Sequence, residues 1–256
     1  MSPWICRICV VVLGGWLCLG APWAARAGPP FSPGEDLRFG VRWEQVAAGS
    51  CWLKILPPPQ KDNAPAWHFR LKAESNSLVD ALHKIRERVD SLTALDFSTS
   101  ILYRHQASGR KQKDILVQFY PDKGQVQYAN YGGKRDPVDI VSMTLDPLAA
   151  LYRVRSLDLD VGQRFTLPVT DGKKAFFQKG EIVRRERVSV PWGTVDALVL
   201  VPYTTHFSGV FERSEDPRVQ VWISDDERRL PVKIQIKVVI GSIHFDLEHA
   251  VLPDLE

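Results

Sequence analysis

The chain has 256 residues, of which 45% are hydrophobic and 25% charged, and its formal net charge is +3 at pH 7. This composition is that of a globular protein and excludes a disordered or collagen-like chain. A charge so close to zero argues against nucleic-acid binding, because that function concentrates positive charge on one surface. The length suffices for one large all-β domain or for two small domains.

The N-terminus has the three parts of a secretory signal peptide. Arg7 precedes an apolar run at residues 8–19, and the small-x-small sequence at 25–27 follows it. The apolar run is about 12 residues long, which is short for a membrane span, although an uncleaved anchor is the alternative. We expect residues 1–27 to be removed, the protein to be exported to the periplasm, and no membrane-spanning segment in residues 28–256. Loss of Arg7 and Arg26, with no acid, would lower the net charge from +3 to +1.

Cleavage would also determine how many cysteines remain and whether a disulfide can form. Cys6, Cys9 and Cys18 belong to the predicted signal, so only Cys51 would remain and no intramolecular disulfide could form. Cys51 lies in the strand-like run SCWLKI. A small buried core residue is the main interpretation there, and a nucleophile is the alternative.

Apolar and polar residues alternate along much of residues 28–256. A period of two runs through residues 37–43, 67–73, 232–238 and 243–247. This pattern is typical of antiparallel strands that turn one face to a core and the other to water. We expect about eleven strands in all.

Turn-forming sequences separate the alternating runs. Residues 57–65 and 130–137 are rich in proline, glycine and asparagine and predict loops. Asp171-Gly172 predicts a two-residue hairpin turn, because glycine tolerates the positive φ of such a turn. Residues 190–195 predict a second turn between apolar runs.

Two helices are expected. Asp146 can cap a helix whose first residue is Pro147, and one face of this helix would carry Leu148, Leu151, Tyr152 and the aliphatic stem of Arg155. A second, short helix is expected at residues 77–84, with Leu78, Ala81 and Leu82 on one side. The sequence therefore predicts one mainly β domain over residues 28–256, built as an antiparallel, strongly curved sheet or open barrel with one or two short helices.

Several segments carry a family resemblance that covers roughly residues 34–250. They are GEDLRFGVRWEQVAAGSCWLKI, DPLAALYRVRSLDLDVGQRFTLPVTDGKKAFF, VSVPWGTVDALVLVP and WISDDERRLPVKIQIKVVIGSI. These segments resemble the bacterial exported-protein family of domain of unknown function 3108, which implies no activity, substrate or catalytic residue. Trp192 departs from the family pattern, since a small residue is expected in that turn, and this side chain could be exposed. The hairpin from Trp222 to Lys233 is similar, more weakly, to one in the half-barrels of periplasmic lipoprotein carriers.

Sequence motifs for catalysis, metal binding and phosphate binding are not met. There is no G-x-S-x-G, the six histidines form no H-E-x-x-H, and TDGKK lacks the preceding glycine of a phosphate loop. Basic runs at 110–114 and 184–187 are interrupted by acids, which favours a solvated face over a nucleic-acid groove. We expect no catalytic residue, no cofactor and no metal site.

The charged run at residues 225–229, DDERR, lies between two alternating segments. Aspartate closes turns through its own side chain, and Pro231 suits the first position of the next strand. An acid/base site is the alternative, but it would require both aspartates to share a desolvated cleft. We therefore expect a hairpin turn here.

The leading hypothesis is a non-enzymatic envelope protein that binds a hydrophobic ligand in a β-built cavity. Acyl-chain lipid or another envelope component is the expected partner. The cavity would be lined by apolar side chains that recur at a period of two, namely Phe39, Val41, Trp43, Trp67, Phe69 and Leu71. The alternative is an interaction module that presents sheet edges or Trp192 to a partner, and an enzyme comes third.

Overall fold

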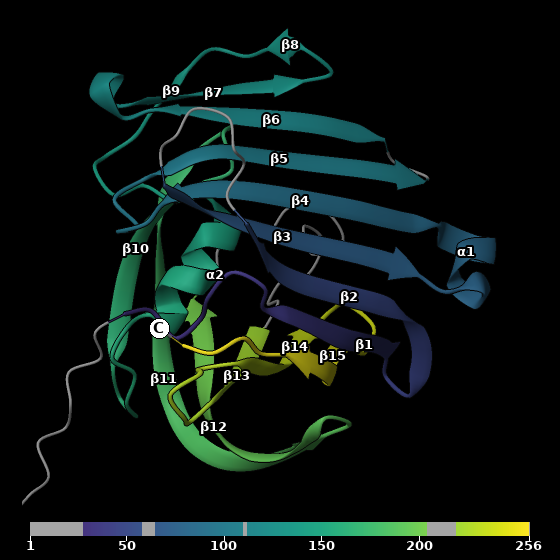
Figure 1. Ribbon diagram of the computed structural model, residues 1–256. Coiled ribbons are helices and arrows are strands. Elements are labelled where there is room, and N and C mark those ends of the chain that lie inside the picture. The colour runs from purple at the N-terminus through teal and green to yellow at the C-terminus, as the bar shows by residue number, and fades with distance from the viewer. Residues whose placement is uncertain (1–27, 58–64, 110–111, 204–218, 256) are drawn as a thin grey trace, which may run out of the picture.

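The computed structural model describes residues 28–57, 65–109, 112–203 and 219–255. The predicted signal peptide, its three cysteines and most of the predicted loop at 57–65 lie outside these residues. The described chain folds into one antiparallel sheet that curls without closing, and a helix packs inside the curl (Figure 1). The predicted mainly β, strongly curved or open architecture is therefore confirmed.

The described residues contain fifteen strands, so the expected number of about eleven is wrong. The strands are β1 (Asp36–Trp43), β2 (Val46–Leu56), β3 (Ala66–Ser75), β4 (Ile85–Ala94), β5 (Ser100–Gly109), β6 (Lys113–Tyr120), β7 (Gln125–Asn130), β8 (Gly133–Lys134), β9 (Val138–Asp139), β10 (Arg164–Thr170), β11 (Ala175–Val190), β12 (Gly193–Tyr203), β13 (Val219–Ser224), β14 (Pro231–Lys237) and β15 (Ser242–Val251). Part of the excess lies in β8 and β9, which are two residues long. β8 lies within the segment predicted as a loop, residues 130–137, and β9 begins directly after it. Two residues are too few to show an alternating pattern in the sequence. These strands are recognised only by their pairing with β7.

Neighbouring strands pair in the order β10-β11-β12-β13-β14-β15-β1-β2-β3-β4-β5-β6-β7-β8, and β9 also pairs with β7. The first and last strands of the domain, β1 and β15, thus lie side by side in the middle of the sheet. One parallel bridge, Leu145 to Val169, joins the chain before the long helix to the edge strand β10. The backbone N–H of Ser100 donates to the carbonyl of Thr144 at 3.3 Å, so the same short segment also touches the start of β5.

Both expected helices are present. α2 (Pro147–Arg155) begins after Asp146, whose carboxylate accepts the backbone N–H groups of Leu148 and Ala149. α1 (Ser77–His83) begins after Asn76, whose side chain accepts the N–H of Val79. A single 3-10 turn, η1 (Pro121–Lys123), connects β6 to β7.

The predicted turns are confirmed in place but not always in form. Residues 190–195 form the tight β11–β12 turn, and residues 225–229 lie in the β13–β14 turn. The β10–β11 connection has four residues rather than two, because Thr170 pairs with Ala175. Asp171 holds this wider turn by accepting the N–H groups of Lys173 and Lys174.

The core lies between α2 and the inner face of the curled sheet. Tyr152 of α2 is fully buried and stacks on Phe69 of β3, with the ring centroids 3.9 Å apart. Phe31, before β1, packs edge-on against Tyr152 and Trp67. Long strands β11 and β12 bend around the other side of α2 (Figure 1), where Val154 joins a second apolar cluster with Ile182 and Leu198.

Candidate functional site

The six predicted cavity residues do not form one cavity lining. Phe39 and Phe69 are fully buried in the core beside α2, and Trp67 packs against the same cluster. Val41 and Leu71 are half-buried at the margin of that cluster. Trp43 is 49% exposed at the end of β1, where its indole N–H donates to the carbonyl of Ile240 at 2.9 Å.

Beyond α2, the inner face of the sheet keeps an apolar surface that is only partly covered. Val41 pairs directly with Phe245 of β15, which pairs with Ile234 of β14, so the three side chains share this face. Leu71 and Ala73 of β3 continue it on the other side of β2. All five residues are half-buried. We call this set the inner apolar surface.

Polar side chains border the inner apolar surface. Glu87 pairs with Ala73 across β3 and β4, and the ring Nε2 of His105 lies 3.2 Å from its carboxylate. This hydrogen bond, opposed by burial and helped by the positive charges of His105 and Lys113, lowers the pKa of Glu87. Ligand pockets are commonly apolar with a few polar groups at their border, so this arrangement is the stronger candidate site.

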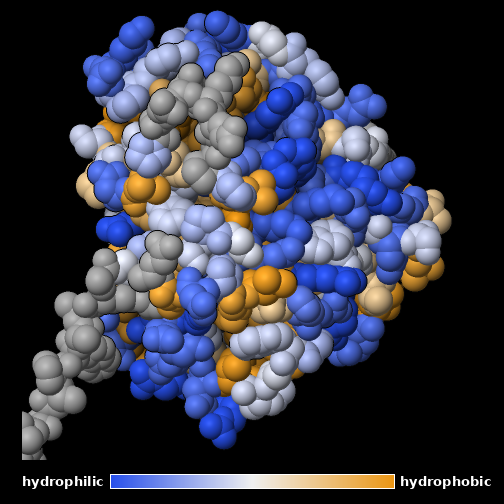
Figure 2. Space-filling model, in the orientation of Figure 1, coloured by the Kyte–Doolittle hydropathy of each residue, from blue (hydrophilic) through white to orange (hydrophobic). Residues whose placement is uncertain are grey.

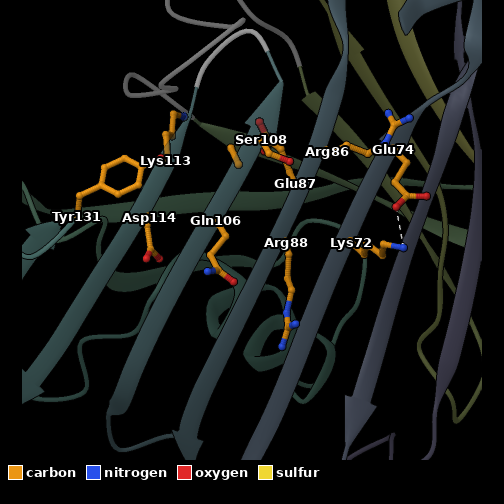
Figure 3. Close-up of a pocket in the computed structure, with 11 residues that line it drawn as sticks. Lys72, Glu74, Arg86, Glu87, Arg88, Gln106, Ser108, Lys113, Asp114 and Tyr131 are labelled. Atoms are coloured by element: carbon orange, nitrogen blue, oxygen red, sulfur yellow. Dashed lines mark ion pairs between the residues drawn. The ribbon is translucent and has the colours of Figure 1, made fainter.

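An open depression of about 410 Å³ is a further feature; it is lined mainly by side chains of the outer face, and also by Glu87 and Lys113. Its side chains rise from neighbouring strands β3 to β6, with Tyr131 at one edge (Figure 3), and the surrounding surface is hydrophilic (Figure 2). Most of its charges already have partners. Lys72 pairs with Glu74 at 2.7 Å, Arg86 with Asp80 and Arg88 with Asp90. Charges that neutralise one another in open solvent leave little to bind a ligand, so this depression is the weaker candidate.

Asp90 of β4 is the most heavily bonded acid of the outer face. Its carboxylate receives hydrogen bonds from Arg70 and Arg88, both at 2.7 Å, and lies 2.8 Å from the ring of His68. Burial alone would raise the pKa of Asp90, but these three partners hold it well below its usual range. The side chain of His68 is 16% exposed and belongs to this cluster.

Replacing Asp90 with asparagine should lower the melting temperature at neutral pH and flatten the acid side of the stability profile. Because the folded pKa of Asp90 is depressed, its contribution is complete above the ordinary aspartate pKa and disappears as pH falls through the folded value. The difference in melting temperature between the parent and Asp90→Asn should therefore shrink progressively in acid. Thermal melts from neutral pH to strong acid measure this, and a difference that stays constant across the range would contradict the assignment.

A buried ion pair was missed by the sequence analysis. The guanidinium Nη1 and Nη2 of Arg155 donate to the two carboxylate oxygens of Glu35, at 2.6 and 2.8 Å. Both side chains are 1% exposed. The guanidinium also donates to the carbonyls of Arg228 and Arg229 at 3.2 and 2.9 Å. The expectation that Arg155 contributes only its aliphatic stem is thus corrected, since its charged head is the buried group. No local pattern could reveal a pair that is 120 residues apart in sequence.

The DDERR segment is a turn docked on this ion pair. Asp226 accepts the N–H groups of Arg228 and Arg229, and Asp225 pairs with Arg185 and Arg229. The two carboxylates therefore face different partners and share no cleft. The geometry assigns the segment a structural contact through its carbonyl groups.

Three further residues have defined places. Burial raises the pKa of the Cys51 thiol to about 12, against a smaller lowering by a backbone hydrogen bond from Trp52. That thiol is therefore un-ionised at neutral pH, as expected of a core residue. Trp192 is half-buried against the core and its backbone N–H donates to Leu247, so it is not the free tryptophan considered above. His244 has a buried Nδ1 without a hydrogen-bond partner among the described residues.

Within the described ranges, no three histidine, cysteine, aspartate or glutamate side chains come close enough to hold a metal ion. None of the helices in the described residues has the length and apolar character needed to cross a membrane.

Comparison with known proteins identifies the family and the fold. The family model described as "Protein of unknown function (DUF3108)" matches residues 38–248, and a comparison with curated proteins gives no match. A crystal structure of a β-barrel-like protein of domain of unknown function DUF1849 from Brucella abortus is similar, with a TM-score of 0.53. The two share 7% identity over 86% of this chain and 98% of that chain, so this similarity shows the fold alone. The family resemblance of the sequence is confirmed: the chain belongs to the DUF3108 family.

Proposed function

We propose that this protein is a non-enzymatic, exported envelope protein that binds an acyl-chain ligand on the inner apolar surface. The observation that carries the proposal is the partial cover of that surface. Next to α2, Phe39 and Phe69 are completely buried, whereas Val41, Leu71 and Phe245 on the same face stay half-exposed. A row of apolar side chains that the protein leaves uncovered is a binding surface for an apolar molecule.

The polar border supports an amphiphilic ligand rather than a plain hydrocarbon. His105 and Lys113 lie at the edge of the inner face, on neighbouring strands β5 and β6. Lys113 also lines the depression described above, and its positive charge acts on Glu87, although it forms no ion pair within the described residues. A carboxylate or phosphate head group would bind the Lys113 ammonium while its acyl chain lies against Leu71, Val41 and Phe245. Apolar sites commonly orient their ligands through a few such polar groups.

The N-terminal sequence supports the export part of the proposal. An Arg7-led apolar run followed by Ala25-Arg26-Ala27 has the layout of a cleaved signal. Cleavage after Ala27 would leave Cys51, whose thiol is buried, as the single cysteine. A fold that does not rely on disulfides then tolerates either redox state of its compartment.

The test is uptake of a dansyl-labelled fatty acid by protein purified from the extracytoplasmic fraction of a bacterial host. The protein should begin at Gly28, bind the probe in lipid-free buffer, and show energy transfer from tryptophan. Leu71→Glu should weaken binding about tenfold or more, because a charge replaces an apolar contact in the site. The matched control is Leu116→Glu, which makes the same change at a half-buried position of the outer face.

Two outcomes would contradict the proposal. One is a folded parent protein that takes up no probe. The other is equal loss of binding by both variants, which would mean a general effect on stability. Ala73→Trp provides a second variant that narrows the inner surface without adding charge. If no ligand binds, the alternative of an interaction module without a small-molecule ligand takes its place.

A further inference from the structure

The most exposed apolar side chains lie at one end of the sheet. Five large hydrophobic residues of the described chain are more than 60% exposed, namely Leu78, Leu82, Tyr131, Val239 and Ile240. They belong to the connections β3–β4, β7–β8 and β14–β15. Antiparallel pairing places all three connections, together with the β1–β2 turn, at the same end.

Three of these connections form a continuous edge. The indole of Trp43 reaches the carbonyl of Ile240 at 2.9 Å, which joins the β1–β2 and β14–β15 turns. Asn76 joins α1 to β2 through two hydrogen bonds, from its side chain to Ala47 and from its backbone to Ala48. Val46, the first residue of β2, is 49% exposed and pairs with Trp43 between these two junctions. We call the exposed apolar side chains of this edge the apolar rim: Trp43, Val46, Leu78, Leu82, Val239 and Ile240.

The helix α1 holds two of these side chains in solvent. Leu78 and Leu82 are 62% and 87% exposed, and a spacing of four residues puts them on one side of the helix. The other side is fixed by Asp80, which binds Ser75 at 2.5 Å and Arg86 at 2.6 Å. The leucines therefore cannot fold back onto the sheet, and they add nothing to the core. Figure 2 shows apolar surface at the edge of the molecule where Figure 1 places α1.

Positive charge without a partner surrounds the rim. Lys84 and Lys237 are exposed, flank α1 and the β14–β15 turn, and form no ion pair within the described residues. The acids nearby are occupied, since Glu74 pairs with Lys72, and Asp80 with Arg86. Glu44 is the exception, and its carboxylate accepts the backbone N–H of Ser242. The rim is thus an apolar edge flanked by two lysines and one glutamate, Glu44, that form no ion pair within the described residues.

We propose that the apolar rim inserts into the surface of a phospholipid bilayer that carries anionic head groups. Separate apolar side chains that protrude from the protein can insert among lipid acyl chains, because the fluid lipid needs no complementary shape. A protein partner, in contrast, requires a contiguous patch of complementary shape. A tryptophan with a bonded N–H is favoured at head-group level. Each lysine without an ion-pair partner adds attraction to an anionic surface, and this attraction weakens as the salt concentration rises.

The inference does not rest on the proposed ligand, but it fits with it. Trp43 ends the same strand that carries Val41, and Ile243 opposite it continues to Phe245. The rim is therefore continuous with the inner apolar surface. A bilayer docked on the rim would face the open end of the site in which we place the acyl chain.

The experiment is flotation of the purified protein with vesicles of phosphatidylcholine, with and without phosphatidylglycerol. The parent protein should bind the anionic vesicles, and binding should fall with added salt. The double variant Leu82→Asp with Ile240→Asp should reduce partitioning of the protein onto vesicles about tenfold or more, because a carboxylate does not insert among acyl chains as the apolar side chain does. Lys84→Glu with Lys237→Glu should abolish the preference for anionic vesicles.

Matched controls come from exposed positions elsewhere on the protein. Val141→Asp with Val251→Asp changes two side chains that are 53% and 50% exposed outside the rim. Lys123→Glu with Lys179→Glu makes the same charge change away from it. No vesicle binding by the parent protein, equal loss in rim and control variants, or lipid-independent capture of an envelope protein through the rim would each overturn the inference. Fatty-acid uptake in lipid-free buffer reports separately on the inner surface, so rim variants should retain it.

Discussion

Replacing Arg155 with methionine is expected to lower the free energy of unfolding by about 3–5 kcal/mol, because it leaves the Glu35 carboxylate buried without its partner. Glu35 is 2% exposed and both oxygens bind the Arg155 fork. The same change also removes the donors that hold the carbonyls of Arg228 and Arg229. Urea unfolding followed by circular dichroism measures the loss.

The double variant Glu35→Leu with Arg155→Met is the informative control. It removes both charges together, so it should be clearly more stable than either single variant. Arg187→Met, in a pair with Asp196 in which both side chains are more than half exposed, should change stability little. If the double variant were as unstable as the sum of the single variants, the packing of these side chains rather than the ion pair would explain the effect.

Replacing Asp146 with alanine should cost about 3 kcal/mol or more, since several buried donors lose their acceptor at once. The carboxylate is fully buried and accepts the hydroxyls of Ser91 and Ser100, both at 2.6 Å. It also accepts the N–H groups of Leu148 and Ala149 at the start of α2. This one side chain therefore ties β4 and β5 to the helix that fills the curl of the sheet.

Asp146→Asn is the matched variant, because an amide oxygen can still cap α2 while the charge is removed. Burial raises the pKa of Asp146 above its ordinary value, against the opposing effect of its hydrogen bonds. The folded protein then holds a proton that the unfolded chain releases, so stability from this group falls as pH rises between the ordinary and the raised pKa. Asp146→Asn should lose this dependence. Alanine and asparagine variants of equal stability at all pH values would contradict the role of the carboxylate.

The replacements at Arg155 and Asp146 test two different contacts that attach the sheet to α2, one at each end of the helix. Arg155 fixes the β13–β14 turn and the segment before β1 to the end of α2. Asp146 fixes β4 and β5 to its beginning. The inner apolar surface lies beyond both contacts, so folded variants at Leu71 or Ala73 can test the proposed ligand binding without disturbing either contact.

Local patterns in the sequence predicted the long strands, both helices and most turns of this fold. Alternation predicted strands that pair antiparallel, because a half-buried strand must turn every second side chain to the core. Asp146 followed by Pro147 predicted where α2 begins, because a helix start requires an acceptor for its free N–H groups. The DDERR turn was predicted for the same kind of local reason, and Asp226 closes it.

The candidate site depended on information that no local pattern contains. Phe39 and Val41 have the same place in the alternation, yet one is buried and the other half-exposed. The difference arises from the length and position of α2, which covers one end of the inner face. Leu78 and Leu82 likewise have the spacing of a core face, but α1 turns them to solvent because Asp80 binds Arg86 on the opposite side.

By itself, the sequence determined the β architecture, the positions of both helices and most turns, and the family, because each depends on neighbours along the chain. The tertiary structure decided which apolar side chains are covered, that Arg155 is a buried ion, and that fifteen strands join one sheet. These properties depend on pairs such as Glu35 with Arg155 and Trp43 with Ile240, which are distant in sequence. Burial and ion pairing are set by what lies opposite in space, and only the curled sheet brings these partners together.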